Sequence, residues 1–288
     1  MHNILLIAND TYFPLLHVCL KSLYAVCKLD SIGKIFIANL GLTENSRNIL
    51  QNFGEKVELV DTDILIDNSN EIHSKGWVDA VSQKTRIFKN LAENGNIPLI
   101  MLDSDMIIIE DFSDVIDSNF DIQVCRRSKP LIRPDGLVVN HIASFFVVNN
   151  RKGLSFVNDW IDRMHERIDL KMFPPHETPA MVETISKNTI LNIGDIDDKI
   201  VSCENNYIPD MTKIVHAKGR TTKDKISIFR FSNIQNLPYK KTLYLFTGKE
   251  KFLFTLSFLS KKIFNFYELK NRLRELKKSI KKQTKNKQ

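Results

Sequence analysis

The chain has 288 residues, of which 43% are hydrophobic and 26% are charged. This composition is typical of an ordinary folded protein and excludes collagen-like, low-complexity and wholly disordered chains. Its four cysteines, Cys19, Cys27, Cys125 and Cys203, include no C-x-x-C pair, which argues against a zinc ribbon or a disulfide-stapled fold.

The positive charge is concentrated at the C-terminal end. The net charge is +7, but residues 239–288 contain 15 basic and 3 acidic residues, whereas residues 1–238 contain 26 basic and 31 acidic residues. A body with a net negative charge repels a polyanion, so we expect no nucleic-acid partner. The basic segment needs an explanation of its own.

Strands and helices alternate along the first hundred residues. Apolar runs predict strands at 3–8, 34–38, 57–60 and 97–102. Between them, the sequence predicts a helix that starts at Pro14, a helix capped by Thr43 and a helix over 82–92. This order indicates an α/β fold with a mostly parallel sheet flanked by helices, and ligands bind such sheets beyond the carboxyl ends of the strands.

Two aspartates follow the last of these strands. Asp103 and Asp105 stand on either side of Ser104 within the run IPLIMLDSDMIII. Carboxylates among apolar residues must be paired or must bind metal, and a divalent cation at a strand end can bridge them to a phosphate. The alternative interpretation is an aspartate pair that caps the following turn.

A histidine far downstream can complete a metal site. His216 ends the short predicted strand of IVHAKGR and is followed by Lys218, Gly219 and Arg220. Carboxylate oxygens favour Mg²⁺ or Mn²⁺, and an added imidazole shifts the preference towards Mn²⁺. The glycine allows close backbone approach and the two cations neutralise charge, which suits a diphosphate. The alternative is a structural or surface histidine.

The C-terminal segment pairs apolar and basic residues. Residues 252–266 are rich in Phe and Leu but too short to span a bilayer, and residues 267–282 place apolar side chains on one helical stripe among lysines and arginines. This pattern predicts attachment to an anionic membrane surface, and the alternative is a core helix with a solvated end. Residues 1–7 show no export signal, so we expect a cytoplasmic protein, peripheral on the inner face of the cytoplasmic membrane.

The chain resembles glycosyltransferase family 8, retaining enzymes that include bacterial lipooligosaccharide galactosyltransferases. The similar segments are ILLIANDTYFPLLHVCLKSL, KTRIFKNL, LIMLDSDMII, HIASFFVVNN and IVHAKGR, in the family's order. The chain departs from the family's pattern after Arg220, where Pro and Trp are missing, and at Ile142-Ala143-Ser144, which replaces Asn-Ala-Gly. The resemblance implies a GT-A catalytic domain over 1–238, followed by a basic tail over 239–288.

The resemblance also implies a set of site residues. Asp103, Asp105 and His216 would hold the metal, and the catalytic groups would be Asp105, Glu177 and Lys218. Contacts to the nucleotide-sugar would come from Ala8, Asn9, Asp10, Tyr12, Arg86, Asp103, Ser104, Gly219 and Arg220. An alternative for Glu177 is that it starts a helix at Pro179, where an acid complements the helix dipole.

The implied reaction is the transfer of a hexose, with retention, from a UDP-sugar donor such as UDP-galactose or UDP-glucose. The acceptor would be a glycan or glycolipid such as lipooligosaccharide, and the metal Mn²⁺ or Mg²⁺. Retention by a carboxylate nucleophile and retention by same-face attack both remain open. Two further alternatives are a nucleotidyltransferase, although residues 8–13 lack the glycine-rich loop of that class, and a sugar-nucleotide-binding protein without turnover.

Overall fold

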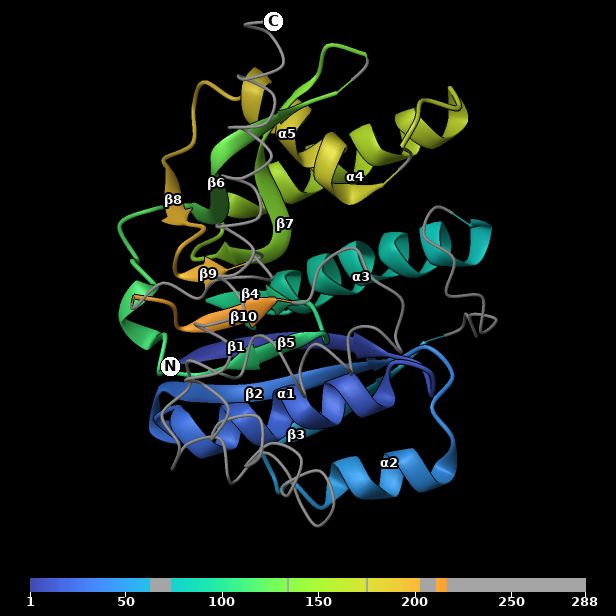
Figure 1. Ribbon diagram of the computed structural model, residues 1–288, viewed down its shortest axis with the longest axis vertical. Coiled ribbons are helices and arrows are strands. Elements are labelled where there is room, and N and C mark those ends of the chain that lie inside the picture. The colour runs from blue at the N-terminus through green and yellow to red at the C-terminus, as the bar shows by residue number, and fades with distance from the viewer. Residues whose placement is uncertain (63–73, 134, 175, 203–210, 217–288) are drawn as a thin grey trace, which may run out of the picture.

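The structure is a computed structural model that describes residues 1–62, 74–133, 135–174, 176–202 and 211–216 (Figure 1). The helices are α1 (Phe13–Val26), α2 (Glu44–Gln51), α3 (Lys75–Glu93), α4 (Gly153–Asp169) and α5 (Glu177–Lys187), with short 3-10 turns at Leu29–Ser31 and Ser113–Val115. The strands are β1 (His2–Ala8), β2 (Ile32–Asn39), β3 (Val57–Asp61), β4 (Leu99–Leu102), β5 (Met106–Ile108), β6 (Ile122–Ile132), β7 (Val138–Val148), β8 (Ile193–Asp197), β9 (Val201–Ser202) and β10 (Ile214–His216).

Seven of these strands form one mixed sheet in the order β3-β2-β1-β4-β7-β6-β8. The pairs β1–β2, β2–β3, β1–β4 and β6–β8 are parallel, and only β7 runs against its two neighbours. Figure 1 shows α2 beside β3 at one end of the sheet and α4 with α5 at the other. The predicted α/β fold with a mostly parallel sheet is confirmed.

Helices cover both faces of this sheet. Because side chains alternate along a strand, Ile4 and Leu6 of β1 pack in one core with Leu20 of α1, whereas Leu5 packs in a second core with Phe88 of α3. Strands that are buried on both faces must be apolar at nearly every position. This explains why the sequence shows continuous apolar runs there instead of alternation.

The predicted boundaries hold at most elements. Pro14 lies in the first turn of α1, and the Thr43 side chain accepts a hydrogen bond from Ser46 N at 3.4 Å as the cap of α2. The helix predicted over 82–92 begins earlier, at Lys75, because Ser74 caps it and accepts from Trp77 N at 3.2 Å. The strand predicted from residue 97 begins at Leu99, since Pro98 has no N–H to donate to a ladder.

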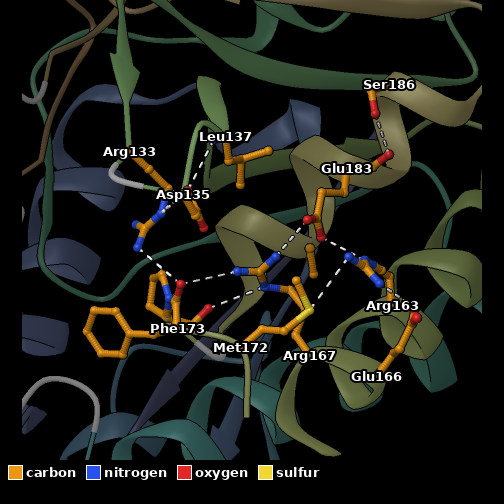
Figure 2. A network of polar contacts seen from close by, with 12 residues as sticks. Arg133, Asp135, Leu137, Arg163, Glu166, Arg167, Met172, Phe173, Glu183 and Ser186 are labelled. Atoms are coloured by element: carbon orange, nitrogen blue, oxygen red, sulfur yellow. Dashed lines mark hydrogen bonds and ion pairs between the residues drawn. The ribbon is translucent and has the colours of Figure 1, made fainter. Parts of the chain in front are cut away.

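A buried ion-pair network joins α4 to α5 (Figure 2). Arg167 is fully buried and donates to Glu183 Oε1 at 2.7 Å, while Arg163 Nε donates to Glu183 Oε2 at 2.7 Å. The Arg167 guanidinium also faces the carbonyl oxygens of Phe173 and Pro174, at 3.5 Å and 3.4 Å. The network therefore fixes the segment that enters α5.

We expect Glu183→Gln to destabilise the protein by about 3 kcal/mol, because it leaves the buried Arg167 charge without its carboxylate. Burial alone would raise the pKa of Glu183, but the hydrogen bonds and charges of Arg163 and Arg167 lower it below 4.5. The stabilisation is therefore complete above pH 4.5 and lost as pH falls through the lowered value. Urea unfolding measured at neutral and acidic pH tests both statements.

The matched control is Glu166→Gln, which removes the other carboxylate that contacts Arg163, at 2.5 Å. The Glu166 side chain is 52% exposed, so its removal should cost less than about 1 kcal/mol. Equal losses in the two variants would show that burial of the Arg167–Glu183 pair is not what stabilises this part of the protein.

Candidate metal and donor site

Two acids and one imidazole meet beyond the end of β4. His216 Nε2 lies 3.2 Å from Asp105 Oδ1 and 3.5 Å from Asp103 Oδ2. One ligand atom from each of the three residues lies within 4.8 Å of the others. Asp105 and His216 are buried, with 5% and 2% of their surfaces exposed. We call these residues the Asp-Asp-His cluster.

Strand pairing explains how residues so distant in sequence meet. β4 ends at Leu102, the two aspartates follow, and β5 begins at Met106. β10 runs antiparallel to β5 in a register that places His216 opposite Met106. The imidazole therefore lies beside the Asp105 carboxylate, and the predicted position of His216 at the end of a short strand is confirmed.

The chemistry of the cluster suits a divalent cation. Two carboxylates with one imidazole form a donor set that binds Mn²⁺ or Mg²⁺. Asp105 is buried and the Asp103 side chain is 24% exposed, and a cation bound between them would offset their negative charge. The structure thus brings together the three residues that the sequence singled out as metal ligands.

Lys84 of α3 is a site residue that the sequence reasoning missed. Its ammonium lies 2.6 Å from Asp103 Oδ1 and 3.9 Å from Glu177 Oε1, and its side chain is only 4% exposed. Burial alone would lower the pKa of Lys84, but the Asp103 and Glu177 carboxylates raise it, so the group is positively charged. A lysine at a buried position of an amphipathic helix was the available signal.

Arg86, which the sequence predicts to contact the donor, lies on another side of α3 from Lys84. Residues two apart on a helix point about 200° from each other, so Arg86 and Lys84 occupy opposite sides of α3. The Arg86 guanidinium is exposed and its Nη2 lies 2.8 Å from His165 Nε2 of α4. Lys84 is the cation that α3 directs at the Asp-Asp-His cluster.

Glu177 is the first residue of α5, and its carboxylate is buried. The His176 side chain caps the helix, so the helix starts two residues before Pro179. Glu177 Oε2 lies 3.5 Å from His176 Nδ1, and the Glu177 carbonyl accepts from Trp160 Nε1 at 2.8 Å. Although burial raises the pKa of Glu177, His176 and Lys84 lower it to about 2, so the carboxylate is ionised.

β7 adds a polar group beside these residues. The Ser144 carbonyl accepts from Asp103 N at 3.1 Å, and Ala143 N donates to Thr178 Oγ1 of α5 at 3.4 Å. Ser144 Oγ is buried and has no hydrogen-bond partner among the residues that the structure describes. A buried hydroxyl of this kind can bond to a polar ligand.

The residues predicted at the end of β1 lie at the same edge of the sheet, because β1 and β4 are parallel. Their side chains, however, make local contacts. Asp10 Oδ1 accepts from Ser46 Oγ at 2.8 Å and from Thr43 N at 3.0 Å, which holds α2 against this edge. Asn9 Oδ1 accepts from Tyr12 N at 3.1 Å.

Ala8 and Ser104, two further residues predicted to contact the nucleotide-sugar, form hydrogen bonds at the end of β1. The Ala8 carbonyl accepts from Leu40 N at 3.0 Å. Ser104 Oγ donates to the Ile7 carbonyl and accepts from Ile7 N, so its hydroxyl ties the aspartate loop to β1. Lys218, Gly219 and Arg220 lie outside the described residues, as does the tail at 239–288.

Comparisons with known proteins give the fold. No protein-family model and no curated protein sequence matches the chain. A solved structure of the glycosyltransferase GlyE of Streptococcus pneumoniae TIGR4 matches 90% of this chain at 14% identity, with a TM-score of 0.57. The WbbM bifunctional glycosyltransferase matches 84% at 12% identity, with a TM-score of 0.53. Mouse xyloside xylosyltransferase 1 matches 76% at 13% identity, with a TM-score of 0.50.

The match covers 63% of the GlyE chain, 51% of the WbbM chain and 98% of the xylosyltransferase chain. The chain therefore spans less than two thirds of the length of each of the first two proteins. At these identities the likeness shows the fold, which is the GT-A fold of glycosyltransferases.

Proposed function

We propose that the protein is a metal-dependent glycosyltransferase that moves a hexose from a nucleoside diphosphate sugar to a glycan or glycolipid acceptor. The observation that carries the proposal is the Asp-Asp-His cluster at the carboxyl edge of a GT-A sheet, with Lys84 and the ionised Glu177 beside it. Carboxylate and imidazole ligands at this edge suit a cation that meets a diphosphate.

Each residue of the site has a defined part in this reaction. Asp103, Asp105 and His216 would hold the cation, which when bound offsets negative charge on the departing diphosphate. The Lys84 ammonium lies 2.6 Å from Asp103 Oδ1 and so orients the carboxylate, whose second oxygen, Oδ2, faces His216. Ser144 Oγ offers a buried hydroxyl for a sugar hydroxyl group.

Glu177 suits the developing sugar cation. Breaking the bond between sugar and phosphate creates an oxocarbenium-like centre, and a buried, ionised carboxylate stabilises such a charge. If Glu177 lies on the sugar face opposite the leaving group, it would act as the nucleophile of a transfer with retention, and same-face attack guided by the leaving phosphate is the alternative. We propose UDP-galactose or UDP-glucose as donor and Mn²⁺ as the metal.

Attachment to a membrane would bring such an enzyme to a glycolipid acceptor such as lipooligosaccharide. The basic, aromatic segment 239–288 is proposed to lie on the inner face of the cytoplasmic membrane. In the part of the chain that the structure describes, no helix has the length and apolar character to cross a bilayer.

A thermal-shift panel of UDP-, GDP- and CMP-sugars, with and without Mn²⁺, tests the proposal. A ligand at 100 times its dissociation constant adds about 2.7 kcal/mol of apparent stability, so the bound donor should raise the melting temperature by several degrees. We expect the shift from a UDP-sugar to require Mn²⁺, and slow release of free hexose to accompany it.

The failures of this panel are informative. A UDP-sugar shift without released hexose would indicate a sugar-nucleotide-binding protein. Nucleoside triphosphates form a further arm of the panel, and a shift with them alone would favour a nucleotidyltransferase.

A further inference from the structure

Exposed apolar side chains are concentrated in two segments of the chain. In the described residues, five of the eight large hydrophobic side chains that are exposed lie at 131–138 and 170–173. Single exposed apolar residues are common on soluble proteins, but a cluster of them marks a contact surface. Ile132 is 72% exposed and Phe173 is 65% exposed.

The two segments lie side by side. β6 and β7 form a hairpin whose far end pairs Ile132 with Val138 and Leu131 with Val139. Arg133 Nη2 donates to the Phe173 carbonyl at 3.3 Å, which brings the loop before α5 to this end of the hairpin. In Figure 2 the Phe173 ring points away from the ion-pair network of α4 and α5. We call Leu131, Ile132, Val138 and Phe173 the hairpin surface.

The hairpin surface is apolar on both sides of the ribbon. Because side chains alternate along a strand, Leu131 points to one side and Ile132 to the other, and Val138 shares the side of Ile132. Val139, the cross-strand partner of Leu131, is buried, so the exposed apolar side chains gather at the end of the ribbon. Apolar side chains at the end of a ribbon can enter a bilayer interface.

Basic residues accompany the apolar ones. Residues 126–138 include Arg126, Arg127, Lys129 and Arg133. Arg126 is paired with Asp195 of β8 at 2.5 Å and Arg133 lies 3.6 Å from Asp135, so Arg127 and Lys129 are the cations of this segment that form no ion pair within the described residues. Lys171 precedes Phe173 by two residues. Apolar side chains flanked by cations are complementary to a bilayer that contains anionic lipids.

The hairpin surface also leads to the candidate site. Ser144, which bonds to the Asp103 backbone, lies six residues along β7 from Val138, or about 20 Å. Phe173 is four residues from Glu177. A bilayer at the hairpin surface would therefore lie about 20 Å along β7 from the strand position that contacts Asp103.

From the exposure, the two-sided ribbon and the basic flank together, we infer that the end of the β6–β7 hairpin, with Phe173, inserts into the surface of an anionic membrane. This contact is separate from the basic tail and does not depend on glycosyl transfer.

Position-specific quenching in the full-length protein tests the inference. Ile132→Trp and Ile190→Trp are mixed with brominated phosphatidylcholine vesicles that contain phosphatidylglycerol. Ile190 is 91% exposed and precedes the start of β8, which pairs with the start of β6, so it lies about 30 Å from the hairpin end. We expect strong quenching at position 132 and none at position 190 beyond that of the native tryptophans.

A second variant measures the contribution to binding. Leu131→Ser with Ile132→Ser should weaken sedimentation with these vesicles by about tenfold, and Ile190→Ser should not. Equal quenching at positions 132 and 190 would overturn the inference. Vesicle binding without quenching at position 132 would also overturn it and would assign the membrane contact to the tail. A concentration-dependent dimer that the double variant breaks would overturn it as well and would assign the hairpin surface to a second copy of the chain. We expect the donor-dependent thermal shift to be unchanged in these variants, so failure here is distinguishable from failure of the proposed function.

Discussion

Asp105→Asn is expected to lower turnover of a nucleotide-sugar by at least about a thousandfold, because it removes one of two carboxylates that would hold the cation. A thousandfold loss corresponds to about 4 kcal/mol of transition-state stabilisation, the scale of a charge held against a leaving diphosphate. Asparagine preserves the shape of the side chain beside His216, at 3.2 Å, so the fold should survive. Steady-state kinetics and Mn²⁺ calorimetry measure the two losses.

The control for this change is Asp114→Asn. Asp114 also follows β5 and pairs with Lys213, but its side chain is 69% exposed and lies outside the Asp-Asp-His cluster. Its loss should leave Mn²⁺ affinity and turnover within about twofold. Undiminished turnover in Asp105→Asn would refute the metal assignment even if the fold proved intact.

The Asp-Asp-His cluster was predictable because the sequence marks it locally. A six-residue apolar run before Asp103 indicates a buried strand, and parallel strands deliver the residues after them to one edge of a sheet. His216 also ends a short apolar run, so its place at a strand end was readable. The pairing of β5 with β10 brings His216 to the two aspartates. This pairing depends on the register between segments that are far apart in the sequence, and a local sequence pattern carries no information on that register.

The sequence could not identify which cation of α3 faces the Asp-Asp-His cluster, and the reason is geometric. Lys84 and Arg86 are both basic and two residues apart, so composition does not distinguish them. Burial distinguishes the two residues, because Lys84 shares the inward face of α3 with Phe88 and Arg86 does not. The long hairpin of β6 and β7 escaped prediction for a related reason, because its far half covers no core and therefore lacks the alternation of a half-buried strand.

Lys84→Met is expected to reduce turnover by about a hundredfold or more while Mn²⁺ still binds. The substitution removes the charge between Asp103 and Glu177, so these carboxylates lose the group that orients them. Breaking a buried ion pair also costs about 3 kcal/mol of stability, and chemical unfolding must therefore accompany the kinetics. Lys84→Arg keeps the charge and should recover both stability and part of the turnover.

Two neighbours on the same helix make this test specific. Lys89 pairs with Glu93 at 3.6 Å on the surface, so Lys89→Met should change neither property by more than about twofold. Arg86→Met separates the sequence-based prediction from the structural one. If Arg86 contacts the donor, its loss should raise KM or lower kcat as Lys84→Met does. Because its guanidinium faces His165 instead, we expect wild-type kinetics, and a defect as large as that of Lys84→Met would reverse the assignment of the two cations.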